Sequence, residues 1–512
     1  MYRKIRGWCA SGTTSTVLAV AFACLATISA CNAIRGTSSP DKTPEQWQAI
    51  ALADLNAVHA AIVDAHPGYI DTVNPGVRAW TEQGYHQARA LIPRVDSYDT
   101  MMSAVHYYVA GFQDGHLIYS DNIRSGGFHE LVNGWRVDEQ GGAAVVTAVM
   151  PAWDGPLPPL GATLLDCDGR TPDAIVADDL APYFDRRSLP SVRTSMLSYI
   201  NSPRLAGLEL KRCTFARPDG TKIAFDVKYR RLPTMDVWKG LRSVRPHSPD
   251  HRNRYDFRDQ VLWIRAANFM LSPDEAKDLD LMLKEIAALH DVRSVVFDTR
   301  GNAGGDSEVG RQILDAATGG LEFDTDGLER LPAVYAQWRV SDISISGVEH
   351  YVDVMSERYG KDDPRTQEMK QLLVKLRDAR RAGTTWVASA GTPRLTRADI
   401  VSRHGRLRRF NGTVAVITDG NCASACLDFV DQVRLVPGST QLGHATASDT
   451  VYLETAPVPL PSGNLLTMPM KVWRNRVRGD GEALVPDIRL NVDFNNDEAV
   501  RAAALDALDR AT

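Results

Sequence analysis

The sequence predicts a multidomain protein of mixed α+β and α/β class. Its 512 residues exceed what one hydrophobic core usually supports, which is about 250 to 300 residues. The spacing of apolar residues changes along the chain, from a helical period near the N-terminus to short β-branched runs in the middle. In the last part, strand-like and helix-like segments alternate, which is typical of a layered α/β domain. We therefore expect a helical N-terminal module, a β-rich domain and an α/β domain.

Residues 1–30 have the features of a secretory signal peptide. Basic residues precede the apolar run 17–30, which is shorter than the about 20 residues of a membrane-spanning helix. The run closes on "ISAC", which resembles a bacterial lipobox and predicts that Cys31 is lipidated. Residues 31–43 would then be a tether, and the protein would be exported and lipid-anchored to a bacterial membrane, facing the periplasm or the cell exterior. An ordinary cleaved signal and an uncleaved anchor are the alternatives.

The next segments differ in their apolar pattern. Residues 44–125 include "WQAIALADLNAVHAAIVDAH", whose helical spacing predicts the N-terminal module. Residues 126–232 contain β-branched runs such as "AAVVTAV" between Gly, Pro and Asp turns, which predicts the β-rich domain. The charged, proline-containing segment 233–254 is expected to be a linker.

Residues 255–498 alternate predicted strands and helices. The nearly continuous apolar run in "RSVVFDTRG" is typical of a strand inside an α/β sheet. Within this domain, the heavily charged stretch 351–383 predicts a helical insertion interrupted at Pro364, either with a solvated surface or as a cap over a cleft. A C-terminal helix is expected over 499–512.

Charge and cysteine usage exclude some functions. A net charge of -5 gives no basic surface for nucleic acid, so we expect no nucleic-acid partner. Four cysteines remain outside the signal peptide and the lipidation site, namely Cys167, Cys213, Cys422 and Cys426. Their wide spacings and the lack of paired CxxC motifs argue against zinc, so we expect no metal. We also expect no cofactor. An even number in an exported protein permits two disulfides.

The stretch "TDGNCASAC", residues 418–426, places Ser424 between an apolar strand and a helix. A hydroxyl at the start of a helix, beside small residues, suits a nucleophile, although the pattern is not GxSxG. The alternative is that Ser424 only caps the helix. If the helix begins at the serine, the spacing of Cys422 and Cys426 allows a disulfide that braces the turn. The other cysteines lie in different predicted strands of the β-rich domain and form the other possible pair.

Two further motifs carry candidate residues. "VVFDTRGNAGGDSEVG" is a strand-to-helix turn that contains Gly304 and Gly305, and the backbone N–H groups of such a turn can face an oxyanion. It lacks both GxGxxG and GK[ST], which argues against nucleotide binding. "GFQDGHLIYS" places His116 in a turn after a helix. A lone histidine of this kind is more often structural than catalytic.

Together and in this order, the motifs resemble the serine peptidases of the C-terminal processing (tail-specific) and tricorn core protease family. The resemblance rests on "DGH" ending at His116, on "DTRGNAGG", on Ser424 with Ala425, and on "PD" at 486–487. It covers nearly the whole chain after the tether, and "DTRGNAGG" is its most specific piece. It implies that the β-rich domain is PDZ-like and that the α/β domain is a crotonase/ClpP-like catalytic domain.

The resemblance also implies a base. The C-terminal processing branch uses a lysine about 25 residues after the serine, but no lysine lies between Ser424 and Lys471. The tricorn-like branch takes its base from the histidine of the N-terminal motif, which corresponds to His116. An imidazole can accept the serine proton at neutral pH and return it to the leaving amine.

The remaining roles follow from the same resemblance. Backbone N–H groups of Ala425 and of Gly304 or Gly305 would hold the oxyanion. A carboxylate shortly before "PD" would support the histidine, and "RGDGEALVPD" offers Asp480 or Glu482. This segment departs from the family pattern, and both carboxylates are otherwise surface charges.

We therefore predict an exported serine peptidase that hydrolyses peptide bonds of a polypeptide substrate through an acyl-enzyme. Ser424 is the predicted nucleophile and His116 the predicted general base. One alternative is a non-catalytic protein that binds a ligand on the same fold, since fold does not fix function. Another is a hydrolase of non-peptide esters or amides.

Overall fold

The computed structural model describes residues 42–122, 129–241, 251–319, 333–389, 410 and 412–511. The predicted signal peptide, the lipidation site at Cys31 and all but the end of the predicted tether lie outside these residues. None of the described helices combines the length and the apolar character that crossing a membrane requires.

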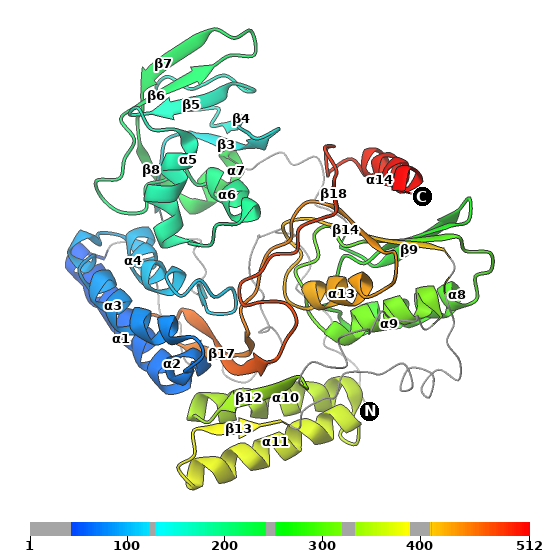
Figure 1. Cartoon of the computed structure of the whole chain (residues 1–512). Helices are drawn as coiled ribbons and strands as arrows, with labels where there is room; N and C mark the ends of the chain where they lie inside the picture. The colour runs from blue at the N-terminus through cyan, green and yellow to red at the C-terminus, as the bar shows by residue number, and fades with distance from the viewer. Residues whose placement is uncertain are drawn as a thin grey trace, which may run out of the picture.

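Four α-helices form most of the N-terminal part of the described chain, coloured blue to cyan in Figure 1. They are α1 (Pro44–Ala65), α2 (Pro67–Ile70), α3 (Pro75–Arg89) and α4 (Tyr98–Ala110). Helices α1 and α4 each begin at a capping box, in which Thr43 or Ser97 accepts a hydrogen bond from the backbone three residues on. Their apolar faces share one core with Leu466 and Met468 of a late strand, β17 (Leu465–Arg474). The first and last parts of the chain are thus packed together.

An antiparallel sheet dominates the middle of the chain. In spatial order its strands are β3 (Trp135–Gln140), β4 (Ala143–Val149), β5 (Thr163–Cys167), β6 (Arg212–Ala216) and β7 (Lys222–Asp226). A disulfide joins Cys167 and Cys213, which are direct register partners in β5 and β6. Helices α5 (Pro172–Ile175) and α6 (Pro190–Leu197) pack on this sheet and share its core. The region closes with the strand pair β2 (His129–Val132) and β8 (Arg230–Pro233), followed by α7 (Thr234–Gly240).

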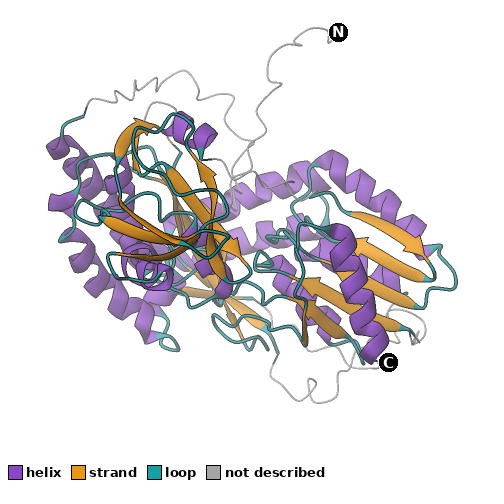
Figure 2. Cartoon of the chain, turned by 90° about the horizontal axis from the view of Figure 1, so that it is seen from above, coloured by secondary structure: helices purple, strands orange, loops and turns teal. Residues whose placement is uncertain are grey.

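A second sheet is mostly parallel and lies between layers of helices, as Figure 2 shows from above. Its order is β18 (Ile488–Arg489), β15 (Thr440–Gly443), β14 (Thr413–Thr418), β11 (Ser294–Asp298), β10 (Val261–Arg265) and the antiparallel β9 (Arg254–Arg258). Helices α8 (Pro273–Ala287), α9 (Ser307–Thr318) and α13 (Ala425–Arg434) cover one face, and α14 (Asp497–Ala511) covers the other. Along β11, Val295 and Phe297 enter the first layer and Val296 enters the second.

A third sheet connects the N-terminal helices to the rest of the chain. It contains β1 (Ile118–Ser120), β17, β12 (Tyr335–Arg339) and β13 (Trp386–Ala388), with β16 (Tyr452–Pro459) also paired to β17. A helical hairpin of α10 (Asp342–Tyr359) and α11 (Pro364–Arg381) packs on it. The hairpin starts at Asp342 rather than at residue 351, because Ser341 caps α10. Pro364 does not interrupt a helix but begins α11, where its missing N–H costs nothing.

Candidate active site

Ser424 lies at the junction between β14 and α13. Its φ of 53° and ψ of -124° form a left-handed conformation that costs a residue with a side chain on the order of 1–3 kcal/mol. Ser424 occupies the N-cap position of α13, but its hydroxyl makes no capping hydrogen bond. The strained backbone therefore does not serve helix capping, and it leaves the hydroxyl available for chemistry.

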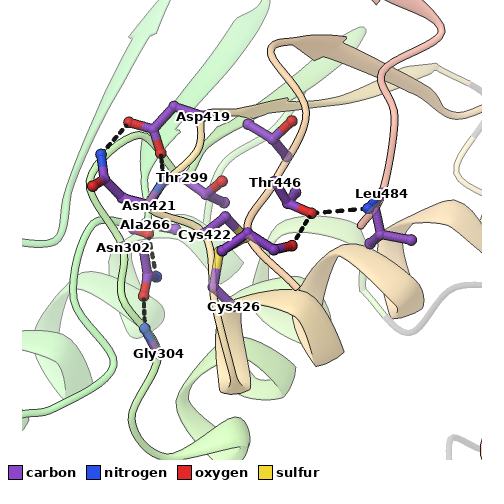
Figure 3. Close-up of a disulfide and its surroundings, with 12 residues drawn as sticks. Ala266, Thr299, Asn302, Gly304, Asp419, Asn421, Cys422, Cys426, Thr446 and Leu484 are labelled. Carbon is purple, nitrogen blue, oxygen red and sulfur yellow. Dashed lines mark hydrogen bonds between the residues drawn. A yellow bond between two sulfur atoms is a disulfide. The ribbon is translucent and has the colours of Figure 1, made fainter. Parts of the chain in front are cut away.

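A disulfide closes the turn that carries Ser424, as Figure 3 shows. It joins Cys422 to Cys426, and both cysteines are fully buried. The carbonyl of Cys422 accepts a hydrogen bond from the N–H of Ala447 at 3.1 Å. Thr446 in turn accepts a hydrogen bond from the N–H of Leu484 at 2.9 Å. The serine turn is thus fixed covalently to its own helix and by hydrogen bonds to a later segment.

The predicted glycine turn lies directly against Ser424. Gly304 has a φ of 100°, and a Cβ placed on it would stand 2.7 Å from the carbonyl oxygen of Ala423 and 2.8 Å from the Cβ of Ser424. Gly305 has a φ of 134°, and a Cβ there would lie 2.3 Å from the backbone of Phe269. Both positions therefore require glycine, the first because the two turns touch.

The backbone N–H groups around Ser424 are not equivalent. The N–H of Gly304 donates to the side chain of Asn302 at 2.8 Å, while the amide of Asn302 donates to the carbonyl of Ala266 at 2.7 Å (Figure 3). Within the described part of the chain, the N–H groups of Gly305 and Ala425 have no hydrogen-bond partner. These two N–H groups are therefore free to bind an oxyanion. The side chain of Asn302 thus distinguishes the two glycines, which the sequence left as equal candidates, because it occupies the N–H of Gly304 and not that of Gly305.

His116 lies in the turn between α4 and β1. Its backbone N–H donates to Asp114 at 2.9 Å, and its Nδ1 atom is 3.9 Å from the same carboxylate oxygen. The other oxygen of Asp114 lies 3.3 Å from Nε2 of His66, and Thr450 donates a hydrogen bond to the first at 2.9 Å. Burial raises the pKa of Asp114, but the hydrogen bond and charge of His66, with smaller contributions from His116, bring it below its usual range. This carboxylate holds the turn in place.

The imidazole of His116 is partly exposed, with 13% of the side chain accessible. Its Nδ1 atom is buried and has no hydrogen-bond partner among the described residues. No hydrogen bond joins it to Ser424 in the described chain, whose hydroxyl is likewise unbonded. Catalytic hydrogen bonds are often long before a substrate is bound and shorten in the complex with it.

The segment 447–450 connects the serine turn to the histidine turn. At one end, the N–H of Ala447 bonds to Cys422, two residues before Ser424. At the other end, Thr450 bonds to Asp114, two residues before His116. The structure thus brings the predicted nucleophile, glycine turn and histidine motif into one neighbourhood.

Arg187, from the middle region, enters the same neighbourhood. Its guanidinium donates to the carbonyl of Ser448 at 2.7 Å, and its Nη1 lies 3.0 Å from where a Cβ on Gly115 would stand. The neighbouring Arg186 stacks over the rings of Trp80 and Tyr107 at 4.6 and 4.4 Å from their centroids. The middle region therefore supports the segment that joins the two turns. Sequence reasoning missed this contribution, because nothing near Arg187 in the sequence distinguishes it from a surface arginine.

Neither predicted acid contacts His116 in the structure. Asp480 accepts hydrogen bonds from the N–H of Val451 at 2.9 Å and from Asn74 at 3.1 Å. Burial raises its pKa, with the charge of Asp114 adding to the effect and the bond from Val451 opposing it. Glu482 accepts a hydrogen bond from the N–H of Gly479, three residues earlier, at 2.7 Å.

A third carboxylate, Glu454, was missed in the sequence. It has a φ of 51°, and it forms an ion pair with the buried Lys471 at 2.9 Å. The charge of Lys471 lowers the pKa of the half-exposed Glu454, and the charge of His116 adds to the lowering. Its left-handed backbone is the kind of outlier that sequence alone does not reveal at a glutamate. Among the described residues, no group of three His, Cys, Asp or Glu side chains is placed to hold a metal ion.

Comparison with known proteins was made by sequence and by fold. The model of peptidase family S41 matches residues 260–490. No curated protein matches the sequence of the chain. Among solved structures, the fold is similar to mature CPAF complexed with lactacystin, with 13% identity, a TM-score of 0.54, and coverage of 91% of this chain and 98% of that one.

Two further structures are similar over most of this chain. The photosystem II D1 C-terminal processing protease has 13% identity and a TM-score of 0.34, with 88% of this chain and 96% of that chain covered. The tricorn protease has 14% identity and a TM-score of 0.36, with 90% of this chain and 36% of that chain covered.

Proposed function

We propose that this chain, a serine-type peptidase whose residues 260–490 match the model of peptidase family S41, cleaves polypeptides through an acyl-enzyme on Ser424. The observation that carries this assignment is the contact between Gly304 and the left-handed Ser424. The assignment is also supported by the hydroxyl of Ser424 and the N–H groups of Gly305 and Ala425, which have no hydrogen-bond partner among the described residues. That is the combination that acyl transfer requires.

In the proposed reaction, Oγ of Ser424 attacks the scissile carbonyl carbon while His116 takes the hydroxyl proton. The tetrahedral oxyanion is held by the N–H groups of Gly305 and Ala425, and the removal of one such donor typically costs about a hundred- to thousandfold in rate. His116 then gives its proton to the leaving amine, and the acyl-enzyme forms. A water molecule attacks the ester, and its proton returns through His116 to free Ser424.

The assignment of His116 is supported by the state of the lysine that the other branch of the family would use. Lys471, the first lysine after Ser424, is buried in an ion pair with Glu454. His116 is instead tied to the serine turn through the segment 447–450. The supporting acid stays a prediction between Asp480 and Glu482. Asp480 is favoured because its bond to Val451 puts it one residue from Thr450, which holds the histidine turn.

The middle region would act as a PDZ-like domain that binds an extended part of the polypeptide. An antiparallel sheet with packed helices supports this role, because such a sheet can accept a peptide strand at its edge. The α/β region would be the crotonase/ClpP-like catalytic domain.

We further propose that the protein is exported and lipid-anchored through Cys31 to a bacterial membrane, facing the periplasm or the cell exterior. The lipobox-like "ISAC" motif motivates the anchor. The two disulfides support an oxidising compartment, because such bonds persist outside the cytosol. Metabolic labelling with a radioactive fatty acid would test the anchor, since a Cys31→Ser variant should lose the label while the wild type incorporates it.

A fluorophosphonate probe tests the nucleophile and the base. Wild-type protein should be labelled covalently, Ser424→Ala should not be labelled, and His116→Ala should be labelled at least about a hundredfold more slowly. Ser439→Ala and His290→Ala are matched controls, because they remove the same groups elsewhere and should label at the wild-type rate.

Equal labelling of wild type and Ser424→Ala would sink the nucleophile assignment. Normal labelling of His116→Ala would return that histidine to a structural role. Peptide and ester substrates should then be compared, because hydrolysis of esters alone would contradict the proposal that the substrate is a polypeptide.

A further inference from the structure

The tip of the helical hairpin touches the glycine turn. Helix α10 ends at Tyr359, whose hydroxyl donates a hydrogen bond to Asp306 at 2.8 Å. Asp306 directly follows Gly305, one of the two residues whose N–H is free beside Ser424. The charged hairpin therefore contacts the turn that is proposed to bind the oxyanion.

Asp306 fixes the far side of Gly305. Its N–H donates to the carbonyl of Phe269 at 2.9 Å, and its Oδ1 caps helix α9 by accepting from the N–H of Glu308 at 3.0 Å. The second carboxylate oxygen is left for Tyr359. With Asn302 holding Gly304 on the near side, Gly305 is fixed between two hydrogen-bonded residues. A glycine without such neighbours would sample many backbone conformations.

The surroundings of Tyr359 favour this bond. The guanidinium of Arg365 stacks over its ring at 3.6 Å from the centroid, and Arg358 approaches the carboxylate of Asp306 at 4.0 Å. Burial, followed by the hydrogen bond to Asp306, raises the pKa of Tyr359 to about 12. The hydroxyl therefore keeps its proton and donates throughout the neutral range.

The middle of helix α10 is attached to the sheet that carries the histidine turn. Tyr351 in α10 donates to the carbonyl of Thr455 in β16 at 2.8 Å and accepts from the N–H of the same residue at 3.1 Å. β16 pairs with β17, which pairs with β1, the strand that follows His116. The hairpin thus spans from the sheet of the proposed base to the turn of the proposed oxyanion site.

We infer that Tyr359 is a positioning residue for the oxyanion site, acting through Asp306 to hold the N–H of Gly305 toward Ser424. This inference rests on the proposed function. It concerns a residue that does not touch the substrate, so its loss should weaken the stabilisation of the transition state more than it weakens ground-state binding.

Fluorophosphonate labelling at several probe concentrations separates the two effects. For Tyr359→Phe, which keeps the ring under Arg365, the maximal labelling rate should fall about tenfold, as a small misplacement of reacting groups would cause. The probe concentration at half-maximal rate should stay within about twofold of wild type, because ground-state binding is largely intact. Tyr255→Phe is the matched control, since it removes a tyrosine–carboxylate hydrogen bond to Glu285 on α8, away from both turns. It should change neither quantity.

Hydrogen exchange gives a readout that does not depend on activity. A peptide covering residues 300–310 should exchange faster in Tyr359→Phe than in wild type and in Tyr255→Phe. Unchanged exchange and an unchanged maximal labelling rate would overturn the inference, as would equal slowing of labelling in both variants. If wild-type protein is not labelled at all, the proposed function fails, and the exchange comparison still decides whether Tyr359 orders the glycine turn.

Discussion

The two turns that meet at Ser424 are alike in topology but differ in how they are held. Each leaves a buried strand of the same parallel sheet and enters a helix, from β14 to α13 and from β11 to α9. The serine turn is closed by a disulfide between residues four apart. The glycine turn has no covalent brace and is held by Asn302, Asp306 and Tyr359.

The two turns therefore differ in which parts of the chain hold their backbone conformation. The serine turn has a covalent brace within its own short segment, which the hydrogen bond from Ala447 to Cys422 supplements. The glycine turn depends on the backbone of Ala266 and Phe269 and on a helix tip more than 50 residues further along the chain, since 53 residues separate Asp306 from Tyr359. Damage far from the serine is therefore expected to reach the reaction through the glycine turn.

The largest expected effect comes from the contact between the turns. Gly304→Ala would push a methyl group against the backbone of Ala423 and Ala425, which cannot move without disturbing Ser424. Labelling by a fluorophosphonate should slow by at least about a hundredfold. Gly438→Ala is the matched control, because Gly438 also has a positive φ of 74° but no heavy atom within 4 Å of a new Cβ. It should lose about 1–2 kcal/mol of stability and label normally. Normal labelling of Gly304→Ala would contradict the close approach of the two turns.

An intermediate effect is expected from removal of the covalent brace. Replacing both Cys422 and Cys426 by Ala opens a loop of separation 4 and should cost about 2 kcal/mol, whereas the same change at Cys167 and Cys213, with a separation of 46, should cost about 4 kcal/mol. Labelling should show the opposite order. It should slow about tenfold in the first double variant, through misplacement of Ser424, and stay within about twofold in the second.

Denaturant unfolding and labelling rates of the two double variants check this reversal. If the Cys167 and Cys213 variant also lost its labelling while still folded, the disulfide near Ser424 would have no special role.

The smallest expected effect concerns Asp419, which links the turns. Its carboxylate accepts hydrogen bonds from the N–H of Gly301 at 3.0 Å and from Asn421. Burial raises the pKa of Asp419 above its ordinary value, against the effect of these bonds. At pH values between the ordinary pKa and the raised pKa, the folded state therefore binds more protons at this site than the unfolded chain does. The free energy of unfolding falls as the pH rises through this range. Asp419→Asn should remove that fall.

Thermal unfolding at acidic and neutral pH tests this prediction. Wild type should lose more stability than Asp419→Asn between the two conditions. Parallel pH profiles would show that the site does not titrate differently in the folded and unfolded states.

The local features of the candidate site could be predicted from the sequence. The apolar strand before Ser424 and the glycines before α9 are short-range signals, and the spacing of Cys422 and Cys426 sets what a disulfide can span. The match of residues 260–490 to the model of peptidase family S41 agrees with the resemblance that these motifs suggested.

Three of the residues that sequence reasoning missed depend on contacts between distant segments. Asn302 occupies the N–H of Gly304 only because its amide is oriented by the carbonyl of Ala266 in a neighbouring segment. The positions of Arg187 and Tyr359 follow from how the middle region and the hairpin dock. Neither residue belongs to a motif. The apolar period of a helix predicts which face is buried, but it does not predict which turn the end of the helix will contact.

The shared core of the first helices and the last strands has a consequence for how the protein is made. Tyr119, just after the histidine turn, bonds to Asn464 at 2.8 Å across 345 residues of sequence. At about 5–20 residues per second, a ribosome takes on the order of 20 to 70 s to add that length. During this time the apolar face of the N-terminal helices lacks its partner strand β17 and is accessible to chaperones. The proposed histidine and serine come together only when the chain is nearly finished. We therefore expect the peptidase to be inactive during most of its own synthesis.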